Sequence, residues 1–201
     1  MTQIGFPFTS EHSPSVSIAE VLAEIEAQKG TFVRGFNPVD FDISGSVSAV
    51  MSNYTVFGDS YQGLRFVNAL TRSARMNAGA FSSDYNNAFS PFFVISFIST
   101  DSGLAAGNVR LQLDVAYSTP ATAFSNALPY SETILLTEAV PATGAGQVAL
   151  FRGIFTCNAA LTAPLQRIHI KISRLGGDAA DTYTGNIVMI GCIHSFRRTT
   201  I

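Results

Sequence analysis

The sequence contains little charge, no tryptophan and only two cysteines. Charged residues make up 13% of the 201 residues, about half of the usual share of ~25%. The 12 basic and 14 acidic residues are scattered and give a net charge of −2, whereas nucleic-acid binding needs a clustered basic face. Cys157 and Cys192 are too few for a disulfide framework and lack the spacing of a metal-binding knuckle. We therefore expect no nucleic-acid partner and two small core cysteines in a reducing cytoplasm.

Long apolar runs are missing as well. The most apolar stretch, residues 92–98, has the length of a strand, and a membrane span needs about 20 such residues. Residues 1–10 lack the basic and apolar regions of a signal peptide, so we expect no membrane partner. A hydrophobic content of 47% with 16 phenylalanines excludes a disordered chain. Low charge in a folded protein favours one that hides much of its surface in an assembly.

Enzyme motifs are absent from the sequence. It contains no G-x-S-x-G, no H-E-x-x-H and no P-loop, so we expect no catalytic residues, no metal and no cofactor. His169 and His194 lie on predicted strands, each next to at least one isoleucine, where we expect them to face outward or to be hydrogen-bonded. A zinc site that combines these histidines with Cys157 and Cys192 is a minor alternative, because no ligand pair has short spacing.

The first 30 residues have the pattern of an arm followed by one helix. Ser17 and Glu20 match a capping box, and Gly30 matches a helix C-terminal stop, which predicts a helix over residues 18–29. The arm and one stripe of this helix carry apolar side chains without a core of their own, and we predict that they form an interface: Phe6, Phe8, Ile18, Val21, Leu22 and Ile25.

From residue 31 onward the pattern is that of β-structure. Alternating apolar residues predict a half-buried strand over 109–117 and another over 168–173. Residues 186–196 are apolar on both faces, which is typical of a central strand or of one beneath a subunit interface. Further strands are predicted at 31–36, 39–43, 61–70, 92–99 and 147–156. This succession predicts an all-β domain over 31–201, an antiparallel β-sandwich of the jelly-roll kind, with a closed barrel as the alternative.

One loop, residues 176–185, combines paired glycines with two aspartates. Asp178 and Asp181 can bond backbone N–H groups within the turn, or they can contribute to a calcium site, which needs six to eight oxygens. The sequence disfavours a carbohydrate-cleaving or lectin function without excluding it, because it has no tryptophan to form a sugar-stacking platform.

The last third of the chain resembles a known family. Residues 151–155, 168–174 and 177–186, followed by the apolar strand 187–196, resemble the C-terminal β-sandwich module of tailed-bacteriophage virion structural proteins. The resemblance implies a non-enzymatic virion component, often a homotrimer. We expect the loop to fix the register between the last two strands. It would do so through a positive-φ turn at Gly176 and Gly177, hydrogen bonds within the loop and an aromatic side chain packed on the sheet edge. The residues of this structural loop are Gly177, Asp178, Asp181, Thr182 and Tyr183.

The absence of a repeat or coiled-coil shaft in the sequence favours one member of this group. A short arm, one helix and a sandwich suit a capsid decoration or cement protein, which binds the assembled head and stabilises it. The expected partners are other copies of the chain and the major capsid protein. The expected location is the capsid surface of the virion, after synthesis in the host cytoplasm. Alternatives are a neck, head-fibre or tail protein with receptor-binding loops such as 101–108, and a carbohydrate-binding module.

Overall fold

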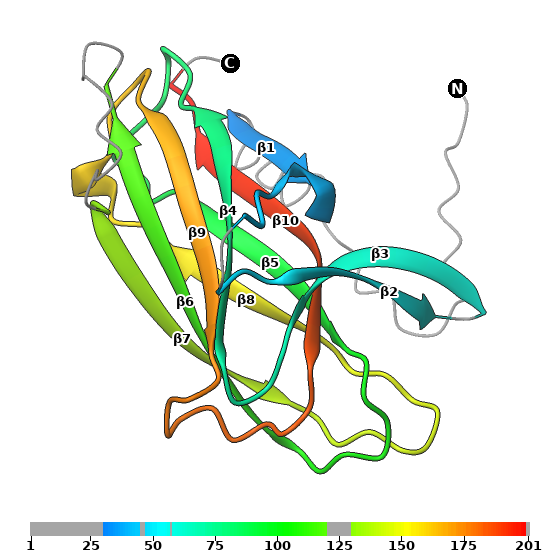
Figure 1. The fold of residues 1–201 in the computed structure, drawn as a ribbon. Helices are drawn as coiled ribbons and strands as arrows, with labels where there is room; N and C mark the ends of the chain where they lie inside the picture. Colours follow the sequence, from blue (N-terminus) through cyan, green and yellow to red (C-terminus); the bar gives the residue numbers. More distant parts are fainter. Residues whose placement is uncertain (1–29, 45–46, 57, 120–129, 200–201) are drawn as a thin grey trace, which may run out of the picture.

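Two antiparallel β-sheets pack face to face in the computed structural model (Figure 1), which describes residues 30–44, 47–56, 58–119 and 130–199. The predicted arm and helix, and with them Phe6, Phe8, Ile18, Val21, Leu22 and Ile25, lie outside the described residues. The described elements are β1 (Thr31–Phe36), η1 (Pro38–Asp40), β2 (Val50–Val56), β3 (Asp59–Phe66), β4 (Thr71–Ala80), β5 (Phe92–Ser99), β6 (Gly107–Ser118), β7 (Glu132–Val140), β8 (Leu150–Thr156), η2 (Ala159–Leu161), β9 (Arg167–Leu175) and β10 (Ile187–Arg197).

The strand order is that of a jelly roll. Sheet A has the order β2-β3-β10-β5-β8, with β1 paired to the C-terminal half of β10, and sheet B has the order β4-β9-β6-β7. Strands pair as nested hairpins: β6 with β7, β5 with β8, β4 with β9 and β3 with β10. This topology confirms the all-β sandwich prediction, and two separate sheets replace the alternative of one closed barrel.

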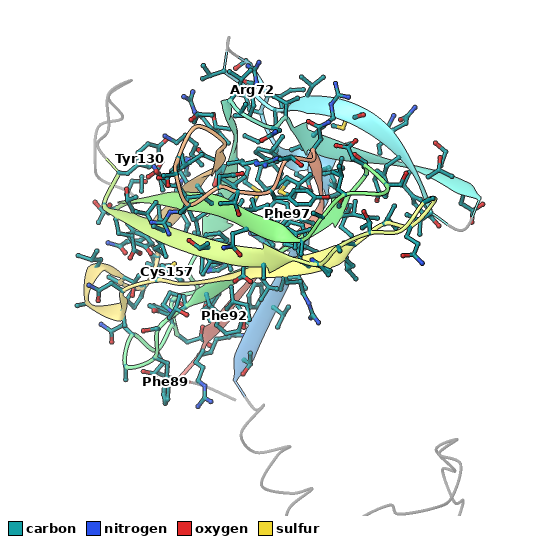
Figure 2. All side chains as sticks on the ribbon, turned by 90° about the horizontal axis from the view of Figure 1, so that it is seen from below. Arg72, Phe89, Phe92, Phe97, Tyr130 and Cys157 are labelled. Carbon is teal, nitrogen blue, oxygen red and sulfur yellow. The ribbon has the colours of Figure 1, made fainter. Side chains whose placement is uncertain are left out.

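Alternating side chains place the core between the sheets. Four alternating residues of the predicted strand 109–117 are fully buried in β6, namely Val109, Leu111, Leu113 and Val115, while Tyr117 is half-buried. The isoleucines of β9 are fully buried as well. Phe97 of β5 packs edge-on against Phe66, with ring centroids 6.3 Å apart, and stacks on Phe151 at 5.3 Å. Figure 2 shows Phe97 among the side chains that fill the space between the sheets. Each such buried ring stabilises the fold by about 1.5–3 kcal/mol relative to an exposed one.

The predicted strands agree with the structure where apolar alternation is strong. Residues 31–36 and 92–99 coincide with β1 and β5, and 186–196 is the central strand β10, which pairs with β1, β3 and β5. The strand predicted over 39–43 is wrong. Pro38 starts a short 3-10 helix there, and the Asn37 backbone N–H donates to Asp40 Oδ2 at 2.7 Å.

Two strand boundaries also differ from the prediction. The strand predicted over 61–70 ends at Phe66, and the chain turns at Ala69, whose φ is 60°. The strand predicted from residue 147 begins at Leu150. Strands β2, β4 and β7 were not predicted, because their sequences mix polar and small residues with the apolar ones.

Candidate interaction surface

A buried ion pair organises the loop between β9 and β10. Both oxygens of Asp181 accept hydrogen bonds from Arg174, at 2.7 and 2.9 Å, and both side chains are fully buried. Two further guanidinium N–H groups donate to the carbonyls of Tyr183 and Gly185, both at 2.6 Å. The Arg110 backbone N–H donates to Asp181 at 3.2 Å. Because Arg174 and the Arg110 backbone engage Asp181, its carboxylate is a structural group, which favours the structural interpretation over calcium.

The rest of the loop binds the ends of neighbouring strands. Thr182 Oγ1 accepts from the Asn108 backbone N–H at 2.9 Å, and the buried Tyr183 hydroxyl bonds to Ser99. Asp178 makes the local bond expected of a turn, with the Ala180 N–H donating to it at 2.8 Å. The loop therefore joins the start of β6 to the end of β5.

Two expectations for this loop are wrong. It does not set the register between β9 and β10, because these strands belong to different sheets and pair with other partners. Gly176 and Gly177 are not among the positive-φ glycines. A Cβ at Gly176 would come within 2.8 Å of the Leu70 backbone nitrogen, so close approach explains glycine there, whereas Gly177 has open space. The bonds of Asp181 also differ from the expected bonds within the loop, because its carboxylate accepts from Arg174 of β9 and from the backbone N–H of Arg110 of β6.

The outer face of sheet B is polar. Asp114 of β6 forms an ion pair with Lys171 of β9 at 2.7 Å and accepts bonds from Gln112 and Thr133. Burial alone would raise the pKa of Asp114, but the bonds from Lys171, Thr133 and Gln112 hold it below its ordinary value. Asp114 itself is buried and its carboxylate is satisfied by these neighbours, while Thr133 and Thr137 occupy exposed outward positions of β7.

The outer face of sheet A is different. The registers of β1, β10, β5 and β8 place successive apolar side chains side by side on it, because residues two apart along a strand share a face. Four of them are largely exposed: Val33 at 59%, Leu150 at 64%, Ile154 at 58% and Ile193 at 42%. We call this surface the apolar face; its residues are Val33, Val94, Leu150, Ile154, Ile190, Ile193 and Tyr61.

Two hollows shape the apolar face. One, of about 440 Å³, runs over Gly35, Ser96 and Gly191 and leaves room beside Ile193, because the two glycines have no side chain and that of Ser96 is small. The other, of about 450 Å³, lies between Leu150 and the β2–β3 hairpin, which projects from the sandwich in Figure 1. Tyr54 and Tyr61 stack across this hairpin with ring centroids 5.7 Å apart. The face can therefore receive a ridge of apolar side chains.

A third cleft is more polar. It has a volume of about 380 Å³ and lies between β2 and two loops at one end of the sandwich. Neutral amide and hydroxyl side chains line it beside one tyrosine: Asn53, Tyr54, Thr55, Thr100, Ser102 and Gln147. Part of the predicted receptor-binding loop 101–108 thus borders a cleft.

Basic side chains lie on or beside the apolar face. Register places Arg152 between Leu150 and Ile154 on β8, and Arg65 beside Val188 on β3. Arg197, at the end of β10, lies over the Phe89 ring at 4.2 Å. Asp59, at the tip of the hairpin, lies on the same face of β3 as Arg65, because the two residues are an even number of positions apart. The centre of the face is therefore apolar, and the charged side chains around it are three arginines and one aspartate.

The histidines and cysteines do not form one site. His194 points into the core and stacks on Phe93, with ring centroids 4.4 Å apart, so the expectation that it faces outward or is hydrogen-bonded is wrong. Its Nε2 is buried without a hydrogen-bond partner, and burial, assisted by Arg34, lowers its pKa to about 4. Burial is also the main cause that raises the pKa of Cys157 and Cys192 to about 12. Both thiols are free and buried, as predicted for core residues.

The described part of the chain holds neither a metal-ligand cluster nor a membrane-spanning helix. Within residues 30–199, leaving aside the undescribed gaps, no three His, Cys, Asp or Glu side chains gather as a metal site would require. In the same residues, no helix is long and apolar enough to cross a membrane.

Sequence reasoning named none of the apolar-face residues as a site, although two signals were present. Residues 186–196 are apolar on both faces, and in β8 the exposed Leu150 and Ile154 alternate with Phe151 and Phe155 of the core. A sandwich strand whose outer face is exposed to solvent would carry polar residues at such positions. Apolar residues on both faces of neighbouring strands therefore mark this surface.

No protein-family model matches the chain, and no curated protein matches it. Among solved structures, the chain is similar to the mannan-recognising carbohydrate-binding module TmCBM27, with 11% identity over 83% of this chain and 98% of that one and a TM-score of 0.43. It is similar to an exo-β-1,3-galactanase from Phanerochaete chrysosporium, with 10% identity, a TM-score of 0.42 and coverage of 81% of this chain and 29% of that one. It is also similar to a chain of infectious bursal disease virus, Gx strain, with 12% identity, a TM-score of 0.35 and coverage of 84% and 32%. The chain thus spans less than a third of the galactanase and of the viral chain, and each likeness is to a distant structure.

Proposed function

We propose that this protein is a non-enzymatic structural component of a virion, of the capsid decoration or cement type, which binds the assembled head as a homo-oligomer. The observation that carries the proposal is the contrast between the two outer faces of the sandwich. Sheet B presents an ion-pair network, whereas sheet A presents Val33, Leu150, Ile154 and Ile193. Contiguous exposed apolar surface marks sites of protein association.

The resemblance of the last third to phage virion modules supports the same function. The loop that carries the resemblance holds a buried ion pair between Arg174 and Asp181 and joins both sheets. A rigid sandwich of this kind suits a part that transmits load, because packed interiors have low compressibility.

The proposed mechanism is mechanical. A standard interface of about 1,600 Å² suffices for stable occupancy, and an oligomer, which we propose to be a trimer, adds avidity without new contacts. The partners would be other copies of the chain and the major capsid protein, and the location would be the capsid surface. Burial of apolar area in many copies then resists the pressure of packaged DNA.

The alternative is a neck, head-fibre or tail protein that binds a receptor through its loops. The observation that favours it is the neutral cleft beside Tyr54, Thr100, Ser102 and Gln147. Amide and hydroxyl groups next to an aromatic ring suit a neutral saccharide, so this cleft also keeps a carbohydrate-binding function as a lesser candidate. Binding in a glycan screen that Tyr54→Ala abolishes would favour this alternative.

The main proposal is tested by light scattering after size-exclusion chromatography and by co-sedimentation with assembled heads. We expect a mass three times that of the 21.4 kDa chain and co-sedimentation with heads. Ile154→Asp should weaken both, because it places a charge in the apolar face. Leu135→Asp is the matched control, since Leu135, which is 49% exposed against 58% for Ile154, is an apolar residue on an outward position of β7 in sheet B. A monomer that ignores heads would contradict the proposal.

A further inference from the structure

The apolar face lacks a cover among the described residues. Leu150 and Ile154 are both more than half exposed although they lie on a regular, well-paired strand. Other apolar side chains adjoin them on the neighbouring strands. The natural occupant of such a surface is another apolar ridge.

The sequence supplies such a ridge outside the described residues. The predicted helix 18–29 would be about 18 Å long, and its one apolar stripe, formed by Ile18, Val21, Leu22 and Ile25, would cover about 10 Å of that length. The four strands β1, β10, β5 and β8 span about 14 Å from first to last, and Leu150 and Ile154 lie about 13 Å apart along β8. The stripe and the face therefore have similar dimensions.

Their charges are complementary. On the predicted helix, Glu24 and Glu26 flank the apolar stripe, one on each side, whereas Glu20 falls on the opposite side of the helix and Lys29 at its end. Three arginines lie on or beside the apolar face, Arg65, Arg152 and Arg197, and one acidic residue, Asp59, lies at the tip of the hairpin. Opposite charges around an apolar contact favour one orientation and one partner.

The connection at Gly30 decides which copy supplies the helix. Gly30 has a φ of +79°, the left-handed conformation of a glycine that ends a helix. Its carbonyl accepts from the Arg198 N–H at 2.6 Å, and a Cβ there would lie 2.9 Å from the Arg198 oxygen. Gly30 is therefore fixed at the level of sheet A, directly before β1.

This fixed point leaves the helix of the same chain little room to fold back. A helix that packs on a sheet has its axis about 10 Å above it, so its nearest Cα atoms lie about 8 Å above the sheet. Lys29 is one Cα step of about 3.8 Å from Gly30. Because no additional residues connect the predicted helix to β1, the short connection favours domain swapping, in which the helix packs on a neighbouring copy.

We propose that the apolar face is the docking site for the N-terminal helix, residues 18–29, of a neighbouring copy of this chain. The proposal deepens the proposed function and rests on the self-association stated there. Because the donor surface and the acceptor surface are different parts of the chain, the contact is head-to-tail and closes a ring when the rotation is right. This contact would give the predicted interface residues Ile18, Val21, Leu22 and Ile25 their partner.

Disulfide trapping tests this contact in the full chain. A copy with Leu22→Cys is co-expressed with a differently tagged copy carrying Ile154→Cys, and mild oxidation is followed by non-reducing electrophoresis. The native thiols are both buried, so they give little background. We expect a covalent dimer that joins the two tags. Leu22→Cys with Leu135→Cys, on the outer face of sheet B, is the matched control and should give at least tenfold less.

The outcomes separate this inference from the proposed function. If the protein is an oligomer but Leu22→Cys joins Ile154→Cys no better than Leu135→Cys, the docking site is wrong and self-association stands. If a single chain with both Leu22→Cys and Ile154→Cys forms only an internal disulfide, the helix packs on its own sandwich and the exchange is refuted. If the unmodified chain is a monomer at every concentration, the proposed self-association fails as well.

Discussion

Replacing Asp181 by asparagine should strongly destabilise the fold. The substitution keeps the shape of the side chain but leaves the Arg174 guanidinium buried without a counter-charge, while both side chains of the native pair are 0% exposed. Breaking a buried ion pair from one side costs about 3–5 kcal/mol of unfolding free energy. In a chain of this size that corresponds to a fall in Tm of roughly 6–20 °C.

The measurement is urea unfolding of the full chain, followed by circular dichroism, with the loss expressed as ΔΔG. Asp178→Asn is the matched control in the same loop, because Asp178 is exposed and makes one local bond to Ala180; we expect it to cost less than about 1 kcal/mol. The difference between the variants should persist in 1 M salt, since buried pairs are poorly screened. The reasoning is refuted if Asp181→Asn and Asp178→Asn unfold within about 1 kcal/mol of each other.

Replacing both Arg174 and Asp181 tests whether the uncompensated buried charge causes the loss of stability. In Arg174→Met with Asp181→Leu no charge stays buried, so the loss from charge burial should disappear. The carbonyls of Tyr183 and Gly185 then lose their donor, at about 1–3 kcal/mol for each group left unpaired. The double variant should therefore still be less stable than the native chain. A loss equal to the sum of two independent single variants would contradict the coupling of the pair.

Three further predictions concern other parts of the sandwich. Burial lowers the pKa of His194 to about 4, so below pH 6.5 the unfolded chain takes up a proton that the folded chain does not. The free energy of unfolding should therefore fall by about 3 kcal/mol between pH 6.5 and 4. In urea titrations at several pH values, His194→Phe should remove most of this pH dependence. Gly63→Ala should destabilise by about 1–3 kcal/mol, because its Cβ would lie 2.3 Å from Val188 Cγ1, whereas Gly35→Ala, with nothing within 4 Å, should change the midpoint little. Ile154→Asp should convert the oligomer to smaller species in light scattering while Leu135→Asp does not; equal effects of the two would remove the distinction between the faces.

The strands that could be predicted from the sequence are those whose environment is asymmetric. In β6 and β9 one face is fully buried, so apolar residues recur at every second position and reveal the strand. Strand β4 has alanines and a methionine on its inner face and a bulge between Asn77 and Ala80, so its pattern is weak. The 3-10 helix after Asn37 shows how Pro38 overrides the β-propensity of Val39 and Phe41.

The candidate site was harder to predict, because it depends on which strands become neighbours. Leu150 and Ile154 look like ordinary strand residues until the register sets Ile154 beside Val94 and Ile193. The loop motif was visible in the sequence, but its partner Arg174 became identifiable only when the loop folded back over the end of β9. His194 was misjudged because a polar side chain next to Ile193 in a strand suggests an outer position, whereas its ring fills a gap among Phe81, Phe93 and Phe196.

The central claim is that this chain is a structural part of a virion head. Its most direct test is immunogold electron microscopy of the virus particles that carry the chain, with an antibody raised against the full-length protein. The account predicts gold label spread over the head surface. Label confined to the neck or tail would replace the decoration role by that of a fibre or adaptor, and particles without any label would contradict the virion function itself.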